Sequence, residues 1–385
     1  MKKIDFLFLI DNINLQGGTE IQTLNIVHAL NDSGHHAKIF SITPCYEKKD
    51  YIISLTQSEY IKYTKKKNSI INKICYERNS DFYIHNILEN YINEIQPKIL
   101  VNQTYDLIHI LPFNLNIKII QVLNWSILGY ENSILEIIKK KKGVIKYLSQ
   151  KVNSYKVELR HSKIKDCSSI IILTESAKNE LKKINQSIKD SQIKIIPNPL
   201  RKTTDSQHIS TLNNHNITFV GRLSHEKGVI RLLKIWKSIS QFLPEYTLSI
   251  YGQGDAKKDM EKFISDNKLK NIIFHGFEKD ISKIYISSDL LLSTSDSEGF
   301  GLVFIEAFYY GVPAISFDCP VSPKEIIKDA GVTIECYNEK KFAEEVLALL
   351  NDKRKLKTLQ SNAIKRARDF FENKIINEWI KLLKI

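Results

Sequence analysis

Short apolar runs alternate with longer amphipathic stretches along all 385 residues of the chain. Several of these runs are apolar without interruption and rich in β-branched residues, as in FLFLI, ILV and IIIL. Strands of this kind are typical of a parallel sheet that helices cover on both faces. The alternation therefore predicts an α/β protein built from doubly wound sheets.

The alternation occurs twice, which predicts two domains. The runs expected to be strands are KIDFLFLI, AKIFSI, KILVN, IKIIQVL, SSIIILT and IKIIP in the first series and ITFVGRL, YTLSIYGQG, NIIFHGF, DLLLSTS, PAISFD and VTIE in the second. The first series ends at IIPNPL (195–200), where two prolines flank Asn198 and a polar segment follows. We expect a Rossmann-like domain over 1–197 and a second one over 198–370, since one core rarely serves so long a chain. An amphipathic helix over 371–385 is expected to pack back on the N-terminal domain. Two such domains that face each other would bind ligands in the cleft between them, beyond the carboxyl ends of their strands.

The charge is positive and uneven. The net charge is +13, and residues 1–196 hold 28 Lys/Arg against 19 Asp/Glu, including the runs Lys65–Lys67 and Lys139–Lys142. A basic face attracts nucleic acid, anionic lipid headgroups or phosphorylated substrates, although a solvated lysine-rich surface explains either run equally well.

The cysteines and the apolar runs limit the cellular compartment expected for this chain. The five cysteines lie far apart without a C-x-x-C pair, which argues against a zinc site and a disulfide framework and fits a reducing cytosol. The start MKKIDFLFLIDN is interpreted as a first strand rather than a signal peptide. No run of 18 apolar residues occurs, so a cytoplasmic protein is expected.

Three glycine-containing turns are expected to bring backbone close to a ligand. In QGGTE, Gly17 and Gly18 open a helix for which Thr19 could be the N-cap, and helix N-termini favour anions. In GRLSHEKG, Arg222 and Lys227 lie between a strand that ends at Gly221 and a helix start. The third turn, YGQG, contains Gly254. A plain strand-to-helix turn explains the first and third equally well.

A fourth motif, SEGFGLVFIEAFYYG, holds two acids around a helix start. Glu298 precedes the helix, and Gly299 to Leu302 can present free N–H groups there. Glu306 is flanked by apolar residues within the helix, so its carboxylate needs a partner or a ligand. Carboxylates and backbone amides together suit a ligand with hydroxyl and phosphate groups.

VGRLSHEKG and SEGFGLVFIEAFYYGVPAIS together resemble the glycosyltransferases of family 4, which have the GT-B fold. IIPNP, YGQG and GGTE fit the same pattern, and Glu298 and Glu306 complete an E-x7-E motif. The resemblance covers about 150 residues of the C-terminal half and the N-terminal half only loosely. It implies transfer from a nucleotide sugar with retained configuration, without a cofactor and without an essential metal.

The resemblance also implies roles for individual residues. Arg222 and Lys227 would hold the donor diphosphate, Glu298 the sugar, and Glu306 the ribose hydroxyls. The remaining donor-site candidates are Gly17, Gly18, Gly221, Gly254, Gly299, Phe300, Gly301 and Leu302. Family members often carry a His after a strand of the N-terminal domain. Here Asn124 stands at that place, His109 is the alternative, and Asn198 is a further candidate. SPKEII, with Ser322, Pro323 and Glu325, would lie near the donor.

These features lead to one expected function and two alternatives. We expect transfer of a hexose or N-acetylhexosamine from a UDP-sugar to a lipid-linked glycan acceptor, in the synthesis of lipopolysaccharide or capsule. The basic first domain would then rest on the anionic inner face of the cell membrane. A UDP-sugar epimerase of the same fold is the first alternative. The second is a non-catalytic protein that binds nucleotides or nucleic acid, although no nucleic-acid recognition motif is present.

Overall fold

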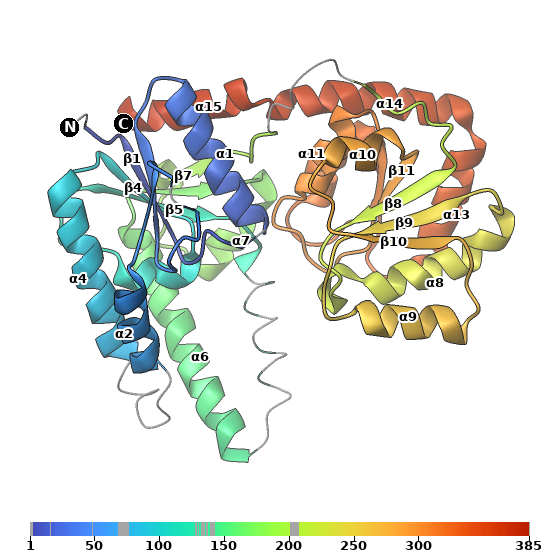
Figure 1. Ribbon diagram of the computed structural model, residues 1–385. Coiled ribbons are helices and arrows are strands. Elements are labelled where there is room, and N and C mark those ends of the chain that lie inside the picture. Colours follow the sequence, from blue (N-terminus) through green and yellow to red (C-terminus); the bar gives the residue numbers. More distant parts are fainter. Residues whose placement is uncertain are drawn as a thin grey trace. The chain divides into compact units, whose positions relative to one another are not determined.

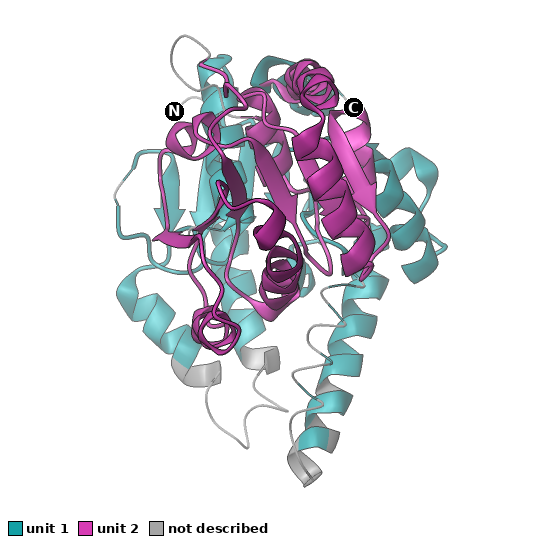
Figure 2. Ribbon diagram, turned by 90° about the vertical axis from the view of Figure 1, so that its right-hand side faces the viewer, with its two compact units in different colours: residues 1–199, 372–385 teal, residues 200–371 magenta. Residues whose placement is uncertain are grey.

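In the computed structural model the chain forms two compact units, Met1–Pro199 with Glu372–Ile385 and Leu200–Phe371 (Figures 1 and 2). From the sequence, these divisions were expected after residues 197 and 370. The structure describes residues 3–15, 17–47, 49–67, 77–127, 129, 131, 135, 138, 143–200 and 208–384. The lysine run 139–142 lies outside the described residues, as do the side chains of Lys65–Lys67.

Unit 1 contains a parallel sheet of seven strands in the order β3-β2-β1-β4-β5-β6-β7. Six of these strands were predicted from their apolar runs. The seventh, β3, has only three residues, lies at the sheet edge and is half-buried, so it lacks that pattern. The strands are β1 (Phe6–Ile10), β2 (Ala37–Ser41), β3 (Ile52–Ser54), β4 (Ile99–Asn102), β5 (Lys118–Leu123), β6 (Ser169–Ile172) and β7 (Ile193–Ile195).

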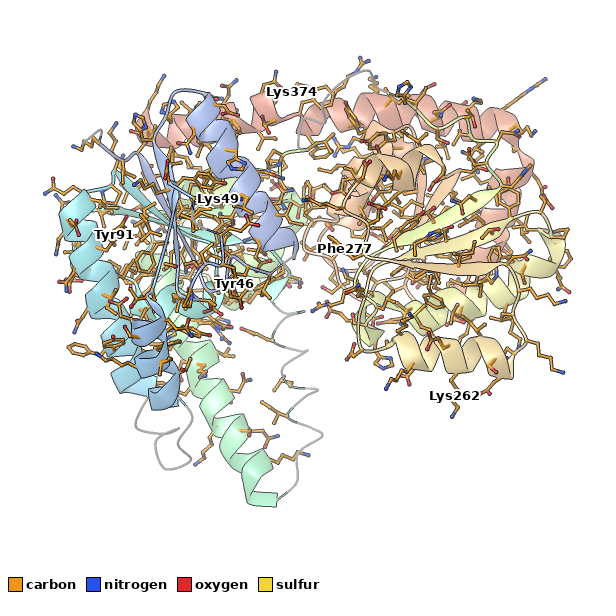
Figure 3. The ribbon with its side chains drawn as sticks, viewed as in Figure 1. Tyr46, Lys49, Tyr91, Lys262, Phe277 and Lys374 are labelled. Carbon is orange, nitrogen blue, oxygen red and sulfur yellow. The ribbon has the colours of Figure 1, made fainter. Side chains whose placement is uncertain are left out.

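Helices cover the unit 1 sheet, and their apolar side chains pack against it. Tyr91 of α4, for example, lies against Phe40 of β2 with ring centroids 5.3 Å apart (Figure 3). The described helices are α1 (Gly18–Asp32), α2 (Gln57–Lys67), α4 (Glu77–Ile95), α6 (Gly143–Lys163), α7 (Glu175–Ile184) and α15 (Glu372–Lys381). The prediction that Thr19 is the N-cap of α1 was wrong. The extended residue Gly17 takes that position, because Ile21 N–H already donates to Gly17 O.

Unit 2 repeats the plan with six parallel strands in the order β10-β9-β8-β11-β12-β13, and all six were predicted. The strands are β8 (Asn216–Val220), β9 (Thr247–Tyr251), β10 (Ile272–Gly276), β11 (Leu290–Ser293), β12 (Ala314–Phe317) and β13 (Gly331–Ile334). The helices are α8 (Val229–Ile239), α9 (Lys257–Asp266), α10 (Ile281–Ile286), α11 (Leu302–Tyr309), α12 (Pro323–Ile327), α13 (Glu339–Asn351) and α14 (Lys353–Ala367).

Each sheet reverses its strand order at one place, between β1 and β4 in unit 1 and between β8 and β11 in unit 2. The connections on the two sides of such a point lead away from each other, and the loops at the carboxyl ends of the strands leave a crevice. The order therefore singles out one edge of each sheet as the place for a ligand. The doubly wound fold class predicted from the sequence is confirmed.

The end of the chain returns to unit 1 as α15, which lies beside α1 (Figure 1). Trp379 of α15 is 2% exposed, and its ring lies 5.5 Å from Phe8 and 6.5 Å from Phe6 between centroids. Both phenylalanines belong to β1, an interior strand of the sheet. The last helix is therefore part of the core of unit 1.

We predict that Trp379→Ala destabilises unit 1 by about 3–5 kcal/mol, the usual cost of removing a buried aromatic side chain. Urea unfolding followed by circular dichroism measures this change. Lys381→Ala, an exposed position on the same helix, is the matched control and should leave the transition unchanged. Equal unfolding midpoints for the Trp379 variant and the unaltered protein would contradict the packing role of α15.

Candidate functional site

Two charged loops meet at the carboxyl ends of β8 and β11, the neighbouring strands at which the order of the unit 2 sheet reverses. Lys227 lies in the loop after β8, and Glu298 lies in the loop after β11. Lys227 Nζ donates a hydrogen bond to Glu298 Oε1 at 2.7 Å, with the two side chains 21% and 11% exposed. The fold thus joins two residues that the sequence analysis had proposed for the diphosphate and the sugar.

The carboxylate of Glu298 has one occupied and one open oxygen. Ser295 Oγ donates to Oε1 at 2.7 Å, beside the lysine. No residue in the described part of the chain donates to Oε2. An ionised carboxylate has room for about four hydrogen bonds, so Oε2 can accept one from a ligand hydroxyl.

Arg222 leaves the tip of β8 and is largely exposed to solvent, with 66% of its side chain accessible. Its Nη2 lies 3.5 Å from Glu226 Oε2, and this pair is likewise solvated. Exposed ion pairs contribute little free energy, so the guanidinium can turn to an anion at small cost. The guanidinium fork suits the two oxygens of a phosphate.

The first turn of α11 supplies backbone donors next to Glu298. No described residue accepts a hydrogen bond from the N–H groups of Gly299, Phe300, Gly301 or Leu302. Gly301 is the N-cap at φ 81°, where a Cβ would lie 2.4 Å from the ring of Phe304. The ring of Phe300 is buried against Phe370, so only its amide can contact a ligand.

Glu306 lies within α11 and is held by a tyrosine. Tyr285 Oη of α10 donates to Glu306 Oε2 at 3.2 Å, and the ring of Tyr310 stacks on that of Tyr285 at 6.0 Å. Burial raises the pKa of Glu306 to about 7, although the hydrogen bond from Tyr285 opposes the shift. The carboxyl group is therefore divided between its neutral and ionised forms at neutral pH.

The glycines after β8 and β9 serve backbone packing. A Cβ on Gly254 would lie 2.2 Å from Leu223 O, and one on Gly252 would lie 1.9 Å from Gly221 O. Leu223 N–H also donates to Gln253 O. These glycines hold the loop with Arg222 against the neighbouring loop, which explains YGQG without a ligand.

In unit 1, Gly17 and Gly18 lie at the N-terminus of α1, as expected, but an acid already lies against that end. Burial raises the pKa of the Glu20 carboxyl, while its closeness to the backbone of Gly17 and of Glu20 itself lowers the pKa by a smaller amount. A Cβ on Gly17 would lie 2.4 Å from Glu20 Oε2. A bound anion at this end of α1 would therefore have to displace the Glu20 side chain.

The remaining candidates of unit 1 have different surroundings. Asn124 follows β5 directly, and its Nδ2 donates to Gln103 Oε1 at 2.8 Å, so it lies at the carboxyl edge of the sheet. His109 lies in a 3-10 turn instead, with Nε2 3.0 Å from Asp81 of α4. Asn198 is buried just before the unit boundary.

Two residues next to the site acids, Tyr285 and Ser295, were not predicted from the sequence. Tyr285 lies in a short helix that carries no motif. Ser295 was not distinguished from the other loop serines, although it lies three residues before Glu298. Ser322 Oγ lies 3.5 Å from Glu298 O, so the segment with Pro323 and Glu325 adjoins the Glu298 loop. Phe277, an exposed residue after β10, also lies beyond the carboxyl end of its strand (Figure 3).

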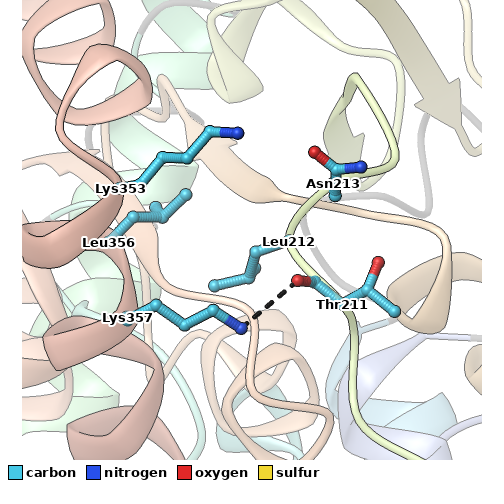
Figure 4. A pocket seen from close by; sticks show the side chains of 6 residues that line it. All are labelled: Thr211, Leu212, Asn213, Lys353, Leu356 and Lys357. Atoms are coloured by element: carbon cyan, nitrogen blue, oxygen red, sulfur yellow. Dashed lines mark hydrogen bonds between the residues drawn. The ribbon is translucent and has the colours of Figure 1, made fainter.

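A separate pocket of about 160 Å³ lies elsewhere in unit 2, between α14 and the segment before β8 (Figure 4). Its lining is Thr211, Leu212, Asn213, Lys353, Leu356 and Lys357, and Lys357 Nζ donates to Thr211 O at 3.4 Å. Residues 211–213 of its lining come before the first residue of β8, and none of its lining residues is an acid. The pocket therefore does not extend the charged site at the carboxyl ends of the strands.

Comparison with known proteins agrees with this geometry. Residues 201–366 match the family described as "Glycosyl transferases group 1". The chain is 26% identical to an uncharacterized glycosyltransferase of Haemophilus influenzae over the full length of both. It is 30% identical, over half of its length and 54% of the relative, to an undecaprenol-linked-glycan alpha-1,4-N-acetyl-D-galactosaminyltransferase of Campylobacter jejuni.

Solved structures share the fold across the whole chain. TarM of Staphylococcus aureus, in complex with UDP and alpha-GlcNAc-glycerol, has a TM-score of 0.75 at 16% identity and full coverage of both chains. HepE of Anabaena, in complex with UDP and glucose, has a TM-score of 0.69 at 17% identity, with 99% of each chain covered. The chain is a glycosyltransferase with the GT-B fold, and its C-terminal unit carries the group 1 glycosyl transferase match.

Proposed function

We propose that this glycosyltransferase moves a hexose or N-acetylhexosamine from a UDP-sugar, with retained configuration, to a lipid-linked glycan of a cell-surface polysaccharide. The observation that carries the proposal is the junction of Lys227, Glu298 and the first turn of α11 at one sheet edge. It offers a cation and unpaired amides to a diphosphate, and a carboxylate oxygen to a sugar hydroxyl.

The chemistry follows from where charge develops. When the bond between the sugar and the diphosphate breaks, negative charge grows on the departing phosphate oxygen. Lys227 and the N-terminal end of α11 are held in place before that charge appears, and the exposed guanidinium of Arg222 can turn to it at small cost, so little reorganisation is needed to stabilise the charge. These groups supply the stabilisation that a metal ion gives elsewhere, which is why we propose transfer without a metal.

The donor and acceptor are inferred from similar proteins. TarM and HepE were solved with UDP bound, which supports a uridine nucleotide here. The Campylobacter relative is named for an undecaprenol-linked acceptor, which supports a lipid-linked one. None of these proteins is named as an epimerase or as a nucleic-acid-binding protein, so the comparisons do not favour either alternative.

The donor is tested with a panel of nucleotide sugars, scored by UDP release and by the rise in melting temperature of the purified protein. We expect release from a UDP-hexose or UDP-N-acetylhexosamine in the presence of EDTA. Loss of activity in EDTA would refute metal-free transfer. Formation of a free, altered nucleotide sugar would instead establish the epimerase.

We predict that Lys227→Ala lowers transfer by about 10²–10³-fold, the usual cost of removing one donor to a developing charge. Arg222→Ala should lower it similarly, since both side chains face the same phosphate oxygens in the proposed complex. Lys234→Ala, an exposed residue of α8, is the matched control and should retain full activity. Near-normal rates for both site variants would refute the diphosphate assignment.

We predict that Glu306 makes UDP affinity depend on pH. An ionised carboxylate accepts hydrogen bonds from ribose hydroxyls, so affinity should fall as the pH drops below about 7, where the group is protonated. Titration calorimetry between pH 5.5 and about 8.5 measures the UDP affinity of the protein and of Glu306→Gln. The phosphate groups of UDP titrate in the same way with both proteins, so a difference between the two pH profiles comes from Glu306. Identical pH profiles for the two proteins would refute the ribose assignment.

The same pKa gives the sign of a stability effect. The folded protein holds the Glu306 proton up to about pH 7, whereas the unfolded chain releases it near the ordinary glutamate pKa of 4.5. Relative to Glu306→Gln, the protein should thus lose up to about 3 kcal/mol as the pH rises from 4.5 to 7, and nothing more above it. Thermal unfolding at these pH values provides the measurement.

The basic N-terminal half motivates the proposed contact with an anionic membrane surface. Among the described residues, no helix is both long and apolar enough to cross a bilayer. Each lysine near an anionic surface contributes about 1 kcal/mol, so replacing Lys139 to Lys142 by Gln should weaken binding strongly. Flotation with phosphatidylcholine vesicles, with and without phosphatidylglycerol, tests this.

The matched control for flotation replaces four exposed lysines of unit 2 by Gln, namely Lys258, Lys262, Lys268 and Lys270. It removes the same charge from the other unit and should float like the unaltered protein. Equal recovery with and without anionic lipid would contradict the membrane proposal.

A further inference from the structure

The loops that carry Lys227 and Glu298 are joined by more than their ion pair. Thr294 Oγ1 donates to Lys227 O at 3.1 Å and to Gly228 O at 3.0 Å. Asp296 N–H donates to Glu226 O at 2.9 Å. The two loops therefore form one hydrogen-bonded unit, although they lie about 70 residues apart in the sequence.

Arg231, in the first turn of α8, bridges this unit with both ends of its guanidinium. Nη1 donates to Thr294 O at 2.6 Å, and Nη2 donates to Asp296 Oδ1 at 2.7 Å. The backbone is packed tightly here, because a Cβ on Gly228 would lie 2.0 Å from Thr294 O and 2.8 Å from Arg231 Nη1. The arginine thus fixes the position of the Glu298 loop against the helix that follows Lys227.

The surroundings of Arg231 are built for its charge. The side chain is only 16% exposed, and its guanidinium carbon lies 4.7 Å from the ring centroid of Tyr337 and 5.6 Å from that of Phe317. A cation in the first turn of a helix is opposed by the helix dipole. Asp296 and the two aromatic rings offset that repulsion. Because the helix itself does not gain from a cation at this position, Arg231 has a role other than stabilising α8.

We infer that Arg231 is a positioning residue for the transfer step. It sets the place of Lys227 Nζ relative to Glu298 and to the amides of α11, without contacting the substrate itself. The inference rests on the proposed role of Lys227 in holding the diphosphate. A shift of about 1 Å in such a group can cost about 100-fold in rate.

The first test is Arg231→Met, which keeps an unbranched apolar stem in place of the methylene chain of the arginine and removes the guanidinium with both hydrogen bonds. We expect kcat for UDP release from UDP-N-acetylglucosamine, or from whichever UDP-sugar the panel shows to turn over, to fall about 10–100-fold. The acceptor KM should stay unchanged, because unit 1 is not altered. Arg231→Lys should recover part of the rate, since an ammonium can still pair with Asp296.

Lys234→Met, one turn further along α8, is the matched control and should leave kcat unchanged. Asp296→Asn is a second variant, which weakens the same bridge from the other loop and keeps the test open if Arg231→Met fails to fold. A melting temperature close to that of the unaltered protein shows that loss of kcat is not loss of fold.

The deciding test is a double-mutant cycle with Lys227→Ala. If Arg231 acts through Lys227, Arg231→Met should lower kcat only about threefold or less in the Lys227→Ala background. Equal fold-losses in both backgrounds, or an unchanged kcat for Arg231→Met and Asp296→Asn, would overturn the inference. Full activity of Lys227→Ala would instead overturn the diphosphate assignment on which it rests.

Discussion

The ion pair between Lys227 and Glu298 is the interaction on which the charged site depends. Both side chains are largely withdrawn from water, and withdrawal of an unpaired charge costs several kcal/mol. The pair offsets that cost only while the two loops stay in place. The two loops are held in place by hydrogen bonds from Thr294 and Ser295 and by the bridge through Arg231. The polar network and the charged pair therefore form one cooperative element.

The order of the strands makes this pair possible. Lys227 and Glu298 lie 71 residues apart, and they meet because β8 and β11 are neighbours where the order of the sheet reverses. Chain connections depart from such a point in opposite directions, which leaves the strand ends open to a ligand. Glycines 228 and 252 then let the backbones of adjacent loops approach to distances that no side chain would allow.

The sequence predicted the fold well because buried parallel strands carry a local pattern. It failed where the determinant is not local. β3 has too few buried residues to show a run, and Gly17 displaces Thr19 as the N-cap through a backbone hydrogen bond. Lys227 and Glu298 were both proposed as site residues, but their contact depends on strand order, which periodicity does not encode. Arg231 was missed because one cation on a helix looks like solvated surface.

Glu306, the residue proposed to bind the ribose, is buried at a cost to the stability of the folded protein. Burial in α11 favours its neutral form, while the hydrogen bond from Tyr285 favours the carboxylate, and the two effects bring its pKa close to neutral. A ligand whose hydroxyl groups donate further hydrogen bonds to Glu306 would favour the ionised form of its carboxyl group. Nucleotide binding would then be coupled to loss of the Glu306 proton. The hydrogen bonds from the ligand's hydroxyl groups would offset the free-energy cost of burying the carboxylate.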